Sequence, residues 1–529
     1  IKDRIMKAEA MKTMYKKLRS YLKPSKHNRL SHIQVPGDGL PPKQSKQWID
    51  IHEPVEIEDK LLERNEGHFG QAEGAFTEGE LGSIPFDGSG RLADDIIRGR
   101  QAPRVDEVIQ TFLEELKRPA SVTTISNELT IDEVIGKFQN WKESTSTSPF
   151  TKHHLGHYHC LLRLMGQEKP DDEPDESITK AKAIFQAHYS ILAHAVKHGR
   201  SLKRWQKVAN SMIEKEPGNP KIHRLWVIHL YEADYNLLLA IFWARKLVHS
   251  AEDSGAFNQH CYGGRPGMSA IEPVFLEELQ VSLAYLSRTN LAVFHNDATS
   301  CYDRIVIALA NLIARRYGMS QEVCSIHGET LAKMKYFVST ALGISEGSYC
   351  NTTMTPVHGT GQGSCASPPV WLQICLVLFD CHEQLSTGAE FFAPDRQTVV
   401  DNSMAGYVDN TKCITNNMNQ THPHTVDELV ATMQEDTQIW GDLLYASGGA
   451  REVPKCKCYI MHWQFDKSGL PRWDAKLDTT IQLENGDRTE SVSLRNDSVT
   501  QAHKTLGCWK SARRDQKRQE TALRERSNT

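Results

Sequence analysis

Long hydrophobic runs are missing from this sequence. The longest apolar stretches, Leu237–Trp243 and Trp371–Phe379, fall far short of the ~20 apolar residues that a helix needs to cross a bilayer. The residue pattern of a secretory signal peptide is also missing. We therefore expect an intracellular protein, cytoplasmic or nuclear, that is not secreted and does not associate with membranes.

A strong excess of one charge is absent as well. The formal net charge is −4 and charged residues make up 24% of the chain, so the overall composition does not indicate a nucleic-acid-binding protein. The charges are unevenly distributed, because residues 1–30 and 503–526 are rich in Lys and Arg whereas residues 53–80 are acidic. A locally positive surface is enough to bind phosphates, although solvated helix faces explain both basic runs equally well.

Regular metal-ligand spacing is the third absence. The twelve cysteines are scattered, and the pair Cys456 and Cys458 has no partner pair at zinc-finger spacing. Residues 153–160 contain four His and one Cys, which could ligate a metal, but no second cluster follows at a suitable distance. Reduced thiols in a cytosolic or nuclear protein fit this pattern.

The length of 529 residues allows about two to four domains. Apolar periodicity predicts helices, and a glycine-rich stretch at residues 70–90 predicts a linker. The predicted helices cover residues 1–30, 55–69, 105–116 and 131–141. Because the chain starts at Ile1 and ends inside a charged, helix-like stretch, we expect it to be a fragment.

The most informative stretch lies in the middle of the chain. Residues Leu291–Phe294 form a short apolar run that predicts a buried strand, and Asp297 follows at its end. Residues 305–313 then show helical spacing, and Gly318 predicts the end of that helix. A carboxylate between a strand and a helix is well placed to hold a metal ion, but an ordinary surface Asp fits the same pattern.

Two later stretches carry further local signals. Residues 359–368, GTGQGSCASP, predict the start of a helix with Ser367 as its N-cap and Pro368 as its first residue. Residues 405–411, AGYVDNT, predict the tip of a β-hairpin, because Asp and Asn favour such turns. Each signal is common when it is taken alone.

In this order the three stretches resemble motifs A, B and C of reverse transcriptases. The matching features are an Asp followed five positions later by an aromatic residue, then Q-G-x-x-x-S-P, then Y-x-D-D. The resemblance is closest to the non-LTR retrotransposon and group II intron type, including the retroelement polymerases of algae and other protists. It implies an α+β fold with right-hand polymerase fingers and palm, in which helices pack on an antiparallel palm sheet behind a mainly α-helical N-terminal region.

The resemblance also divides the chain into four parts. Residues 1–110 are expected to be an N-terminal helical and linker region, and residues 111–203 a helical region leading into the fingers. Residues 204–510 would form the fingers–palm domain, and residues 511–529 the start of a truncated thumb.

The function implied by the resemblance is RNA-directed DNA polymerase of a retrotransposable element. Its partners would be an RNA template, a DNA or RNA primer and deoxynucleoside triphosphates; the sequence does not indicate an oligomeric state. Two Mg²⁺ ions, with Mn²⁺ as a possible substitute, would be bridged by Asp297 and Asp409, and the Ala298 carbonyl would add an oxygen ligand. Tyr302 matches the steric gate that excludes a 2′-hydroxyl, which argues against the alternative of an RNA-dependent RNA polymerase.

The remaining motif positions imply roles around the same site. Residues 213–220 predict a strand and a Pro-Gly loop, and residues 221–230 a second strand; together they resemble the fingers hairpin that holds the triphosphate. The implied nucleotide-binding residues are Lys215, Arg224, Gln362 and Gly363, and Lys455 would be the general acid of motif D. The implied template and primer contacts are Arg265, Ser367, Pro368, Tyr407, Leu506 and Gly507. Each also fits an ordinary turn, cap or solvated side chain.

Two positions depart from the family pattern. Asn410 stands where motif C has its second Asp, so it keeps an oxygen donor but lacks a charge; it remains a candidate catalytic residue. Trp226 stands where the fingers arginine is expected. Both departures favour an alternative interpretation, a catalytically decayed remnant that at most binds nucleic acid.

Overall fold

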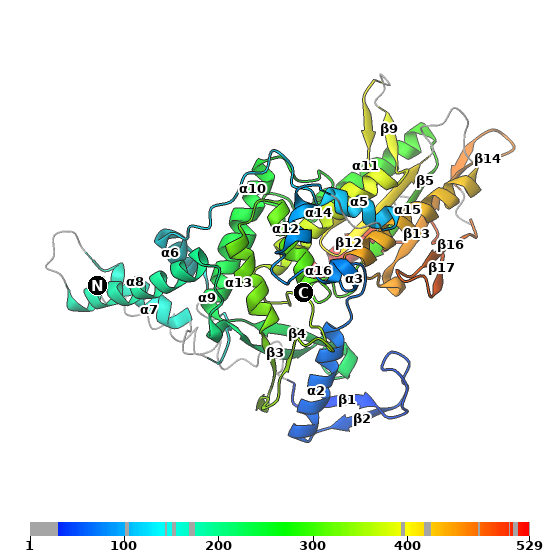
Figure 1. The fold of residues 1–529 in the computed structure, drawn as a ribbon. Helices are drawn as coiled ribbons and strands as arrows, with labels where there is room; N and C mark the ends of the chain where they lie inside the picture. Colours follow the sequence, from blue (N-terminus) through cyan, green and yellow to red (C-terminus); the bar gives the residue numbers. More distant parts are fainter. Residues whose placement is uncertain are drawn as a thin grey trace, which may run out of the picture.

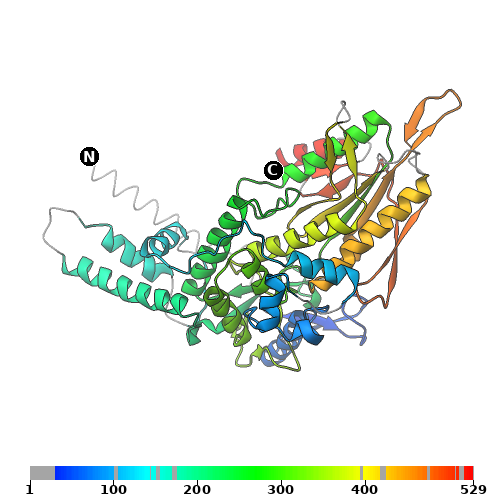
Figure 2. The same ribbon diagram turned by 45° about the horizontal axis from the view of Figure 1, so that its top comes forward.

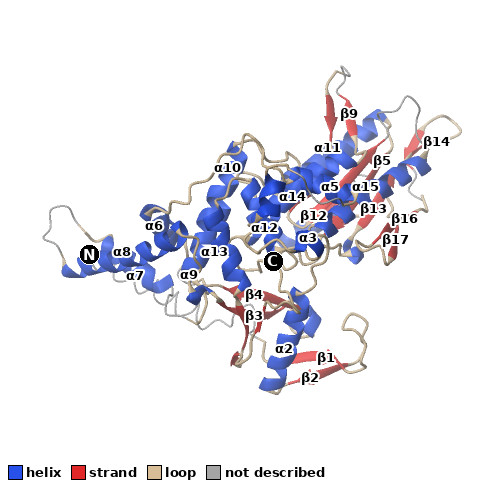
Figure 3. Ribbon diagram, in the orientation of Figure 1, coloured by secondary structure: helices blue, strands red, loops and turns tan. Residues whose placement is uncertain are grey.

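A computed structural model describes most of the chain and shows a mixture of helices and largely antiparallel sheets (Figure 1). The described residues are 30–100, 105–142, 145–150, 155–168, 175–392, 397–416, 425–473, 477–506, 508–511 and 517–527. The strands gather in two main groups, with helices between and around them (Figure 3). This architecture agrees with the predicted mixture of helix and antiparallel sheet. Across the described ranges, no helix combines the length and the apolar character needed to cross a membrane.

The first group is built on a four-stranded antiparallel sheet, here called the central sheet. Its strands, in spatial order, are β11 (Met404–Tyr407), β12 (Asn410–Asn416), β5 (Leu291–Asp297) and β13 (Lys457–Met461). The predicted strand at residues 291–294 and the predicted hairpin are therefore confirmed. The strands β5 and β12 run side by side over their whole length, so the chain segments around residues 297 and 410 meet at one end of the sheet.

Both faces of the central sheet are covered by helices. Alternate side chains of a strand point to opposite faces, and on β5 Phe294 joins the main core while Leu291 and Val293 join a smaller one. The main core includes α14 (Ser367–Leu385) and α15 (Val426–Ala446), which lie side by side along the sheet (Figure 2). On the other face, the smaller core includes residues of α11 (Ile271–Ser287).

The second group is a five-stranded sheet beside the first. Its order is β4-β3-β6-β7, with β8 also paired to β6, and the β3–β6 pair is parallel. The strands are β3 (Lys207–Glu214), β4 (Leu225–Leu230), β6 (Lys335–Thr340), β7 (Gly343–Ile344) and β8 (Tyr349–Cys350). The helices near these strands in the chain are α9 (Ala233–Ile241), which continues as a π-helix over Phe242–Leu247, α10 (Val248–Asp253), α12 (Ile307–Arg316) and α13 (Gln321–Ala332).

The N-terminal region differs from its prediction in two respects. It contains a hairpin of β1 (Ile33–Pro36) and β2 (Trp48–Ile51), which the sequence patterns did not indicate. It also lacks a linker at residues 70–90, because Phe76, Leu81 and Ile84 are buried there. The glycines of this stretch allow close packing: a Cβ on Gly74 would lie 2.1 Å from the Tyr445 carbonyl oxygen.

The predicted helix at 55–69 is confirmed, whereas the basic helix predicted for residues 1–30 lies almost wholly outside the described residues. The helices here are α2 (Pro54–Phe69), α3 (Gly79–Gly82) and α4 (Arg91–Ile97).

The helices predicted near residues 105–116 and 131–141 are confirmed. Asp106 and Thr130 accept hydrogen bonds from backbone N–H groups of the first turns, and Thr130 forms a capping box with Glu133. The helices of this region are α5 (Glu107–Glu115), α6 (Ile131–Asn140), α7 (Leu155–Met165) and α8 (Glu176–Lys197). Helix α5 contacts α14 and α15, so it belongs to the cover of the central sheet.

The remaining elements are short ribbons, 3₁₀ turns and one terminal helix. The ribbons are β9 (Glu390–Phe392) with β10 (Val399–Asp401), β14 (Trp463–Phe465) with β15 (Pro471–Trp473), β16 (Thr480–Glu484) with β17 (Ser491–Arg495), and β18 (His503–Thr505) with β19 (Cys508–Lys510). The 3₁₀ turns cover Lys203–Trp205, Ile222–Arg224 and Val453–Lys455, and the terminal helix is α16 (Lys517–Ser527).

Candidate active site

The two predicted acidic residues meet at one end of the central sheet. Asp297 is the last residue of β5, and Asn410, the first residue of β12, lies directly opposite it. Asp409 occupies the two-residue turn before β12, in which Val408 has a φ of 57°. The Ala298 N–H donates a hydrogen bond to the Asp409 carbonyl oxygen at 3.1 Å. The strand pairing therefore places Asp297 and Asp409 side by side, although more than a hundred residues separate them in the chain.

Lys455 joins this pair from the opposite side of β5. Backbone hydrogen bonds link the segment 450–452 to residues 297–299, and Lys455 Nζ donates to Asp297 Oδ1 at 2.8 Å. Burial raises the pKa of the Asp297 carboxyl, the Lys455 hydrogen bond lowers it, and the Asp409 charge raises it again; the net shift is upward. Burial lowers the pKa of the Lys455 ammonium, but its contact with Asp297 outweighs this, so its pKa is raised. The Asp297 carboxylate is therefore stabilised when a further positive charge, such as a proton or a metal ion, comes close to it.

A cavity of about 350 Å³ opens in front of these residues. It lies between the central sheet and the start of β4. Six of the predicted site residues line it, whereas Asp297 lies outside the lining and reaches it through Lys455. Its lining consists of His68, Lys215, Leu225, Trp226, Val227, Ala298, Ser300, Cys301, Tyr302, Asp303, Gln362, Val408, Asp409 and Lys455. Polar groups dominate this lining, and its lysines can form charge-assisted hydrogen bonds with an anionic ligand.

The two predicted cationic residues of the fingers hairpin are separated by the structure. Lys215 follows β3 and lines the cavity, where burial and the nearby Arg64 charge lower the pKa of its ammonium. Arg224 lies outside the cavity lining and pairs with Glu216 at 3.7 Å. The prediction of a strand from residue 221 is wrong by four residues, because residues 222–224 form a 3₁₀ turn before β4. Trp226 lines the cavity instead of Arg224, with 42% of its surface exposed.

Tyr302 lies in a turn before a helix, and this turn is longer than predicted. Helix α12 begins at Ile307, and its end is marked by Gly318 at a φ of 96°, as expected. The Tyr302 carbonyl oxygen accepts a hydrogen bond from the Thr360 N–H at 3.0 Å, which ties the turn to the loop before α14. The Tyr302 side chain is half-buried against the main core and lines the cavity.

The loop before α14 holds Gln362 and Gly363 against β4. The Gln362 carbonyl oxygen accepts a hydrogen bond from the His229 N–H at 2.6 Å. Gly363 has a φ of 114°, and a Cβ there would lie 2.3 Å from the His229 carbonyl oxygen. Glycine is therefore required at this position by both the backbone conformation and the close approach of β4.

The predicted capping roles of Ser367 and Pro368 are wrong by one residue. The N-cap is Ala366, Ser367 is the first helical residue of α14, and Pro368 is the second. The Ser367 hydroxyl does not cap the helix, because it donates to the Gly361 carbonyl oxygen at 2.6 Å and accepts from the Thr360 hydroxyl. Since Ser367 is 1% exposed, it supports the loop from inside, and a direct template contact by its hydroxyl stays a prediction.

Arg265 is engaged inside the protein. Its guanidinium donates to both carboxylate oxygens of Glu252, at 3.0 and 2.5 Å, and to the carbonyl oxygens of Asn258 and Cys261. The side chain is 8% exposed. A contact between Arg265 and a template phosphate would therefore require this ion pair to open.

The other predicted template and primer residues lie at strand ends. Tyr407 is the last residue of β11 and pairs with Asn410 across the hairpin. Leu506 lies in the turn between β18 and β19 with a φ of 50°, and Gly507 lies outside the described residues. The contacts of these residues with nucleic acid stay predictions.

Two residues of the cavity were missed by sequence reasoning. His68, from α2, and Asp303 both line it, with His68 Nε2 3.0 Å from Asp303 Oδ2. The other oxygen of Asp303, Oδ1, is buried without a hydrogen-bond partner. Asp303 follows Tyr302 directly and could have been considered, whereas no sequence signal connects it to a histidine 235 residues away.

The donor set fits a hard divalent cation. Asp297 and Asp409 supply carboxylate oxygens, and the hydrogen bonds between segments 297–299 and 450–452 leave the Ala298 carbonyl unused. The Lys455 ammonium already places a positive charge beside Asp297. Within the described ranges no group of three or more His, Cys, Asp or Glu side chains is arranged to hold a metal, and His153 and His154 lie outside those ranges. Two carboxylates are enough protein ligands for Mg²⁺, because this ion usually fills its remaining coordination positions with water and substrate phosphates.

Comparison of the chain with protein-family models and with curated proteins finds no match. The functional assignment therefore depends on the sequence motifs and on the geometry of the cavity.

Proposed function

We propose that this chain is an RNA-directed DNA polymerase of a retrotransposable element, with the central sheet as palm and the β3–β4 hairpin as part of the fingers. The observation that carries the proposal is the pairing of β5 with β12, which brings Asp297 at the end of β5 beside Asp409 in the turn before β12, next to Lys455 and the cavity. A cavity lined by Asp409, Lys215 and Lys455, with Asp297 held beside it by Lys455, suits a nucleoside triphosphate and its metal ions. The substrates would be a primed RNA template and deoxynucleoside triphosphates.

Each cavity residue has a role in this proposal. Asp297, Asp409 and the Ala298 carbonyl would hold Mg²⁺ or Mn²⁺, which would align the triphosphate and offset the charge that develops at phosphorus. Lys215 binds the triphosphate through its ammonium. Tyr302 lies under the sugar and leaves no space for a 2′-hydroxyl, so deoxynucleotides are selected.

Lys455 acts as the proton donor to the departing pyrophosphate. Its raised pKa keeps the ammonium protonated at neutral pH, and general acids of this kind contribute about 10²–10⁴-fold to a rate. The Asp297 contact holds the ammonium at the cavity until the substrate enters.

A second candidate function, a decayed remnant that at most binds nucleic acid, is favoured by Asn410. Its side-chain amide donates to Asp409 Oδ1 at 3.3 Å, so the amide uses an oxygen that would otherwise face a cation, and it brings no charge of its own. Trp226 likewise provides no positive charge at the cavity, and Arg224 lies outside the cavity lining, paired with Glu216.

Primer extension on poly(rA)/oligo(dT) with Mg²⁺ or Mn²⁺ separates the two functions. We expect measurable synthesis by the wild-type chain and about 10–100-fold faster synthesis by Asn410→Asp, because an added carboxylate strengthens the metal site. Asn140→Asp, which adds the same charge at the exposed end of α6, should match the wild type.

Absence of synthesis by both the wild type and Asn410→Asp would support the decayed remnant. Incorporation of ribonucleotides in preference to deoxynucleotides would contradict the role assigned to Tyr302.

A further inference from the structure

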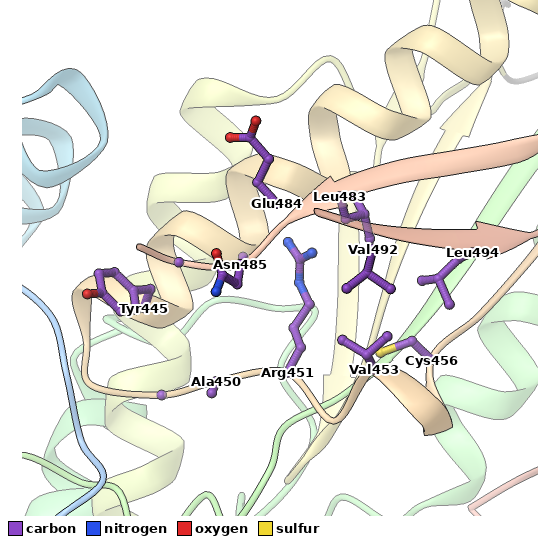
Figure 4. Close-up of a pocket in the computed structure, with 13 residues that line it drawn as sticks. Tyr445, Ala450, Arg451, Val453, Cys456, Leu483, Glu484, Asn485, Val492 and Leu494 are labelled. Carbon is purple, nitrogen blue, oxygen red and sulfur yellow. The ribbon is translucent and has the colours of Figure 1, made fainter. Parts of the chain in front are cut away.

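A second cavity lies behind the segment that carries Lys455. It has a volume of about 110 Å³ and is enclosed by α15, residues 449–456 and the β16–β17 ribbon (Figure 4). The ribbon contributes Leu483, Val492 and Leu494, and the segment contributes Val453. The walls are therefore mainly apolar.

One charged side chain, Arg451, enters this apolar cavity. Its guanidinium points between the ribbon and α15, as Figure 4 shows. One terminal nitrogen donates to the carbonyl oxygens of Thr437 and Gln438 in α15. The Nε atom is buried without a hydrogen-bond partner. A Cβ on Gly441 would lie 1.7 Å from Nη2, so the guanidinium packs directly on the backbone of the helix.

Arg451 forms no ion pair in the part of the chain that the structure describes. The charge of Asp442 acts on its guanidinium, but Asp442 and Glu484, which also lines the cavity, pair with Arg488 at 3.2 Å and 3.8 Å. In Figure 4 the Glu484 carboxylate points away from Arg451. Burial lowers the pKa of the Arg451 guanidinium, yet an arginine stays charged in a protein. Arg451 is half-buried, and a charge drawn out of water normally has a paired anion.

We propose that this cavity binds a small organic anion, a carboxylate with an apolar body of about four carbons, whose oxygens pair with Arg451. The guanidinium presents donors in a planar fork that matches a carboxylate, and the apolar walls take the hydrocarbon body. The volume sets the size of that body: cavities of about 150 Å³ take up benzene, and this cavity is smaller.

The site lies directly against the candidate active site. Residues 298 and 451 face each other in a β-bridge, the Glu452 N–H donates to the Asp297 carbonyl oxygen, and Lys455 follows three residues later. An anion on Arg451 would thus fix the segment that holds Lys455 near Asp297. Binding itself does not depend on polymerase activity, so its test is independent of the proposed function.

Isothermal titration calorimetry with sodium isovalerate tests the proposal. We expect saturable binding with one site per chain, and at least about tenfold weaker binding of the neutral isostere isovaleramide, because a hydrogen bond to a charged group is lost. Sodium chloride at the same concentration controls for ionic strength. No heat of binding at millimolar isovalerate, or equal binding of the amide, would overturn the proposal.

Three variants locate the site. Arg451→Met, which keeps an apolar side chain of similar length, should bind isovalerate at least about tenfold more weakly, and Val492→Trp should block binding by filling the cavity. Arg495→Met removes an exposed arginine from the same ribbon, outside the cavity lining, and should bind within about twofold of the wild type. Unchanged binding by Arg451→Met, or equal losses in Arg451→Met and Arg495→Met, would contradict the assignment to this cavity.

Discussion

Replacing Asp297 by asparagine is expected to lower the rate of primer extension by about 10³-fold or more, because the metal-bridging carboxylate is lost. The asparagine is almost isosteric, and its side-chain oxygen can still accept the hydrogen bond from Lys455 that Asp297 accepts at 2.8 Å. The fold should therefore remain intact, so that any loss of activity reports on the charge.

The matched control is Asp478→Asn. Asp478 is 75% exposed and forms an ion pair with Arg495 on the surface, an interaction worth little. The activity of Asp478→Asn should equal that of the wild type. Circular dichroism should show melting temperatures that agree to within about 2 °C for the wild type, Asp297→Asn and Asp478→Asn. Full activity of Asp297→Asn would contradict the catalytic role of this carboxylate.

Replacing Glu277 by leucine is expected to have the largest effect on stability, about 3–5 kcal/mol in the free energy of unfolding. Glu277 lies on α11 and is 1% exposed. Its carboxylate pairs with Lys412 of β12 at 2.9 Å and with Lys510 of β19, and it accepts a hydrogen bond from the Tyr459 hydroxyl. Burial lowers the pKa of Lys412 and the Glu277 charge raises it; burial is the larger effect, so the pKa is lowered to about 8. Removal of the carboxylate would leave both lysines without the acidic group that pairs with them.

Urea unfolding followed by fluorescence measures this effect, with Glu435→Leu as the control. Glu435 is exposed on α15, so its replacement should change the free energy of unfolding by less than about 0.5 kcal/mol. The double variant Glu277→Leu/Lys412→Met should recover part of the loss, because one of the stranded charges is gone. Equal stabilities of Glu277→Leu and Glu435→Leu would show that the buried cluster does not join α11 and β19 to the central sheet.

Local features of this fold could be predicted because the sequence encodes them within a few residues. The strand ending at Asp297, the hairpin around Asp409 and the helix ended by Gly318 follow from apolar periodicity and turn chemistry. The pairing of β5 with β12 does not follow from local signals, because the register between distant strands depends on the packing of the whole sheet. Its expectation came from the resemblance to reverse transcriptase motifs.

The errors have a common physical origin in long-range contacts. The glycines of residues 70–90 suggested a linker, yet they allow close packing against α12 and α15, as at Gly88 and Gly74. The Ser367 hydroxyl could cap a helix, but in the fold it forms hydrogen bonds with Thr360 and Gly361 of the preceding loop instead. His68 carried no signal at all, because its partner Asp303 is joined to it only by the folded chain.

The most direct test of the account is the binding of Mn²⁺, measured by electron paramagnetic resonance of the free ion with a deoxynucleoside triphosphate present. We predict that Asp297→Asn and Asp409→Asn each weaken the binding of Mn²⁺ by about tenfold or more, that Asn410→Asp strengthens it, and that Asp478→Asn leaves it unchanged. Affinities of Asp297→Asn and Asp409→Asn equal to that of the wild type would contradict the claim that these two carboxylates share a metal site.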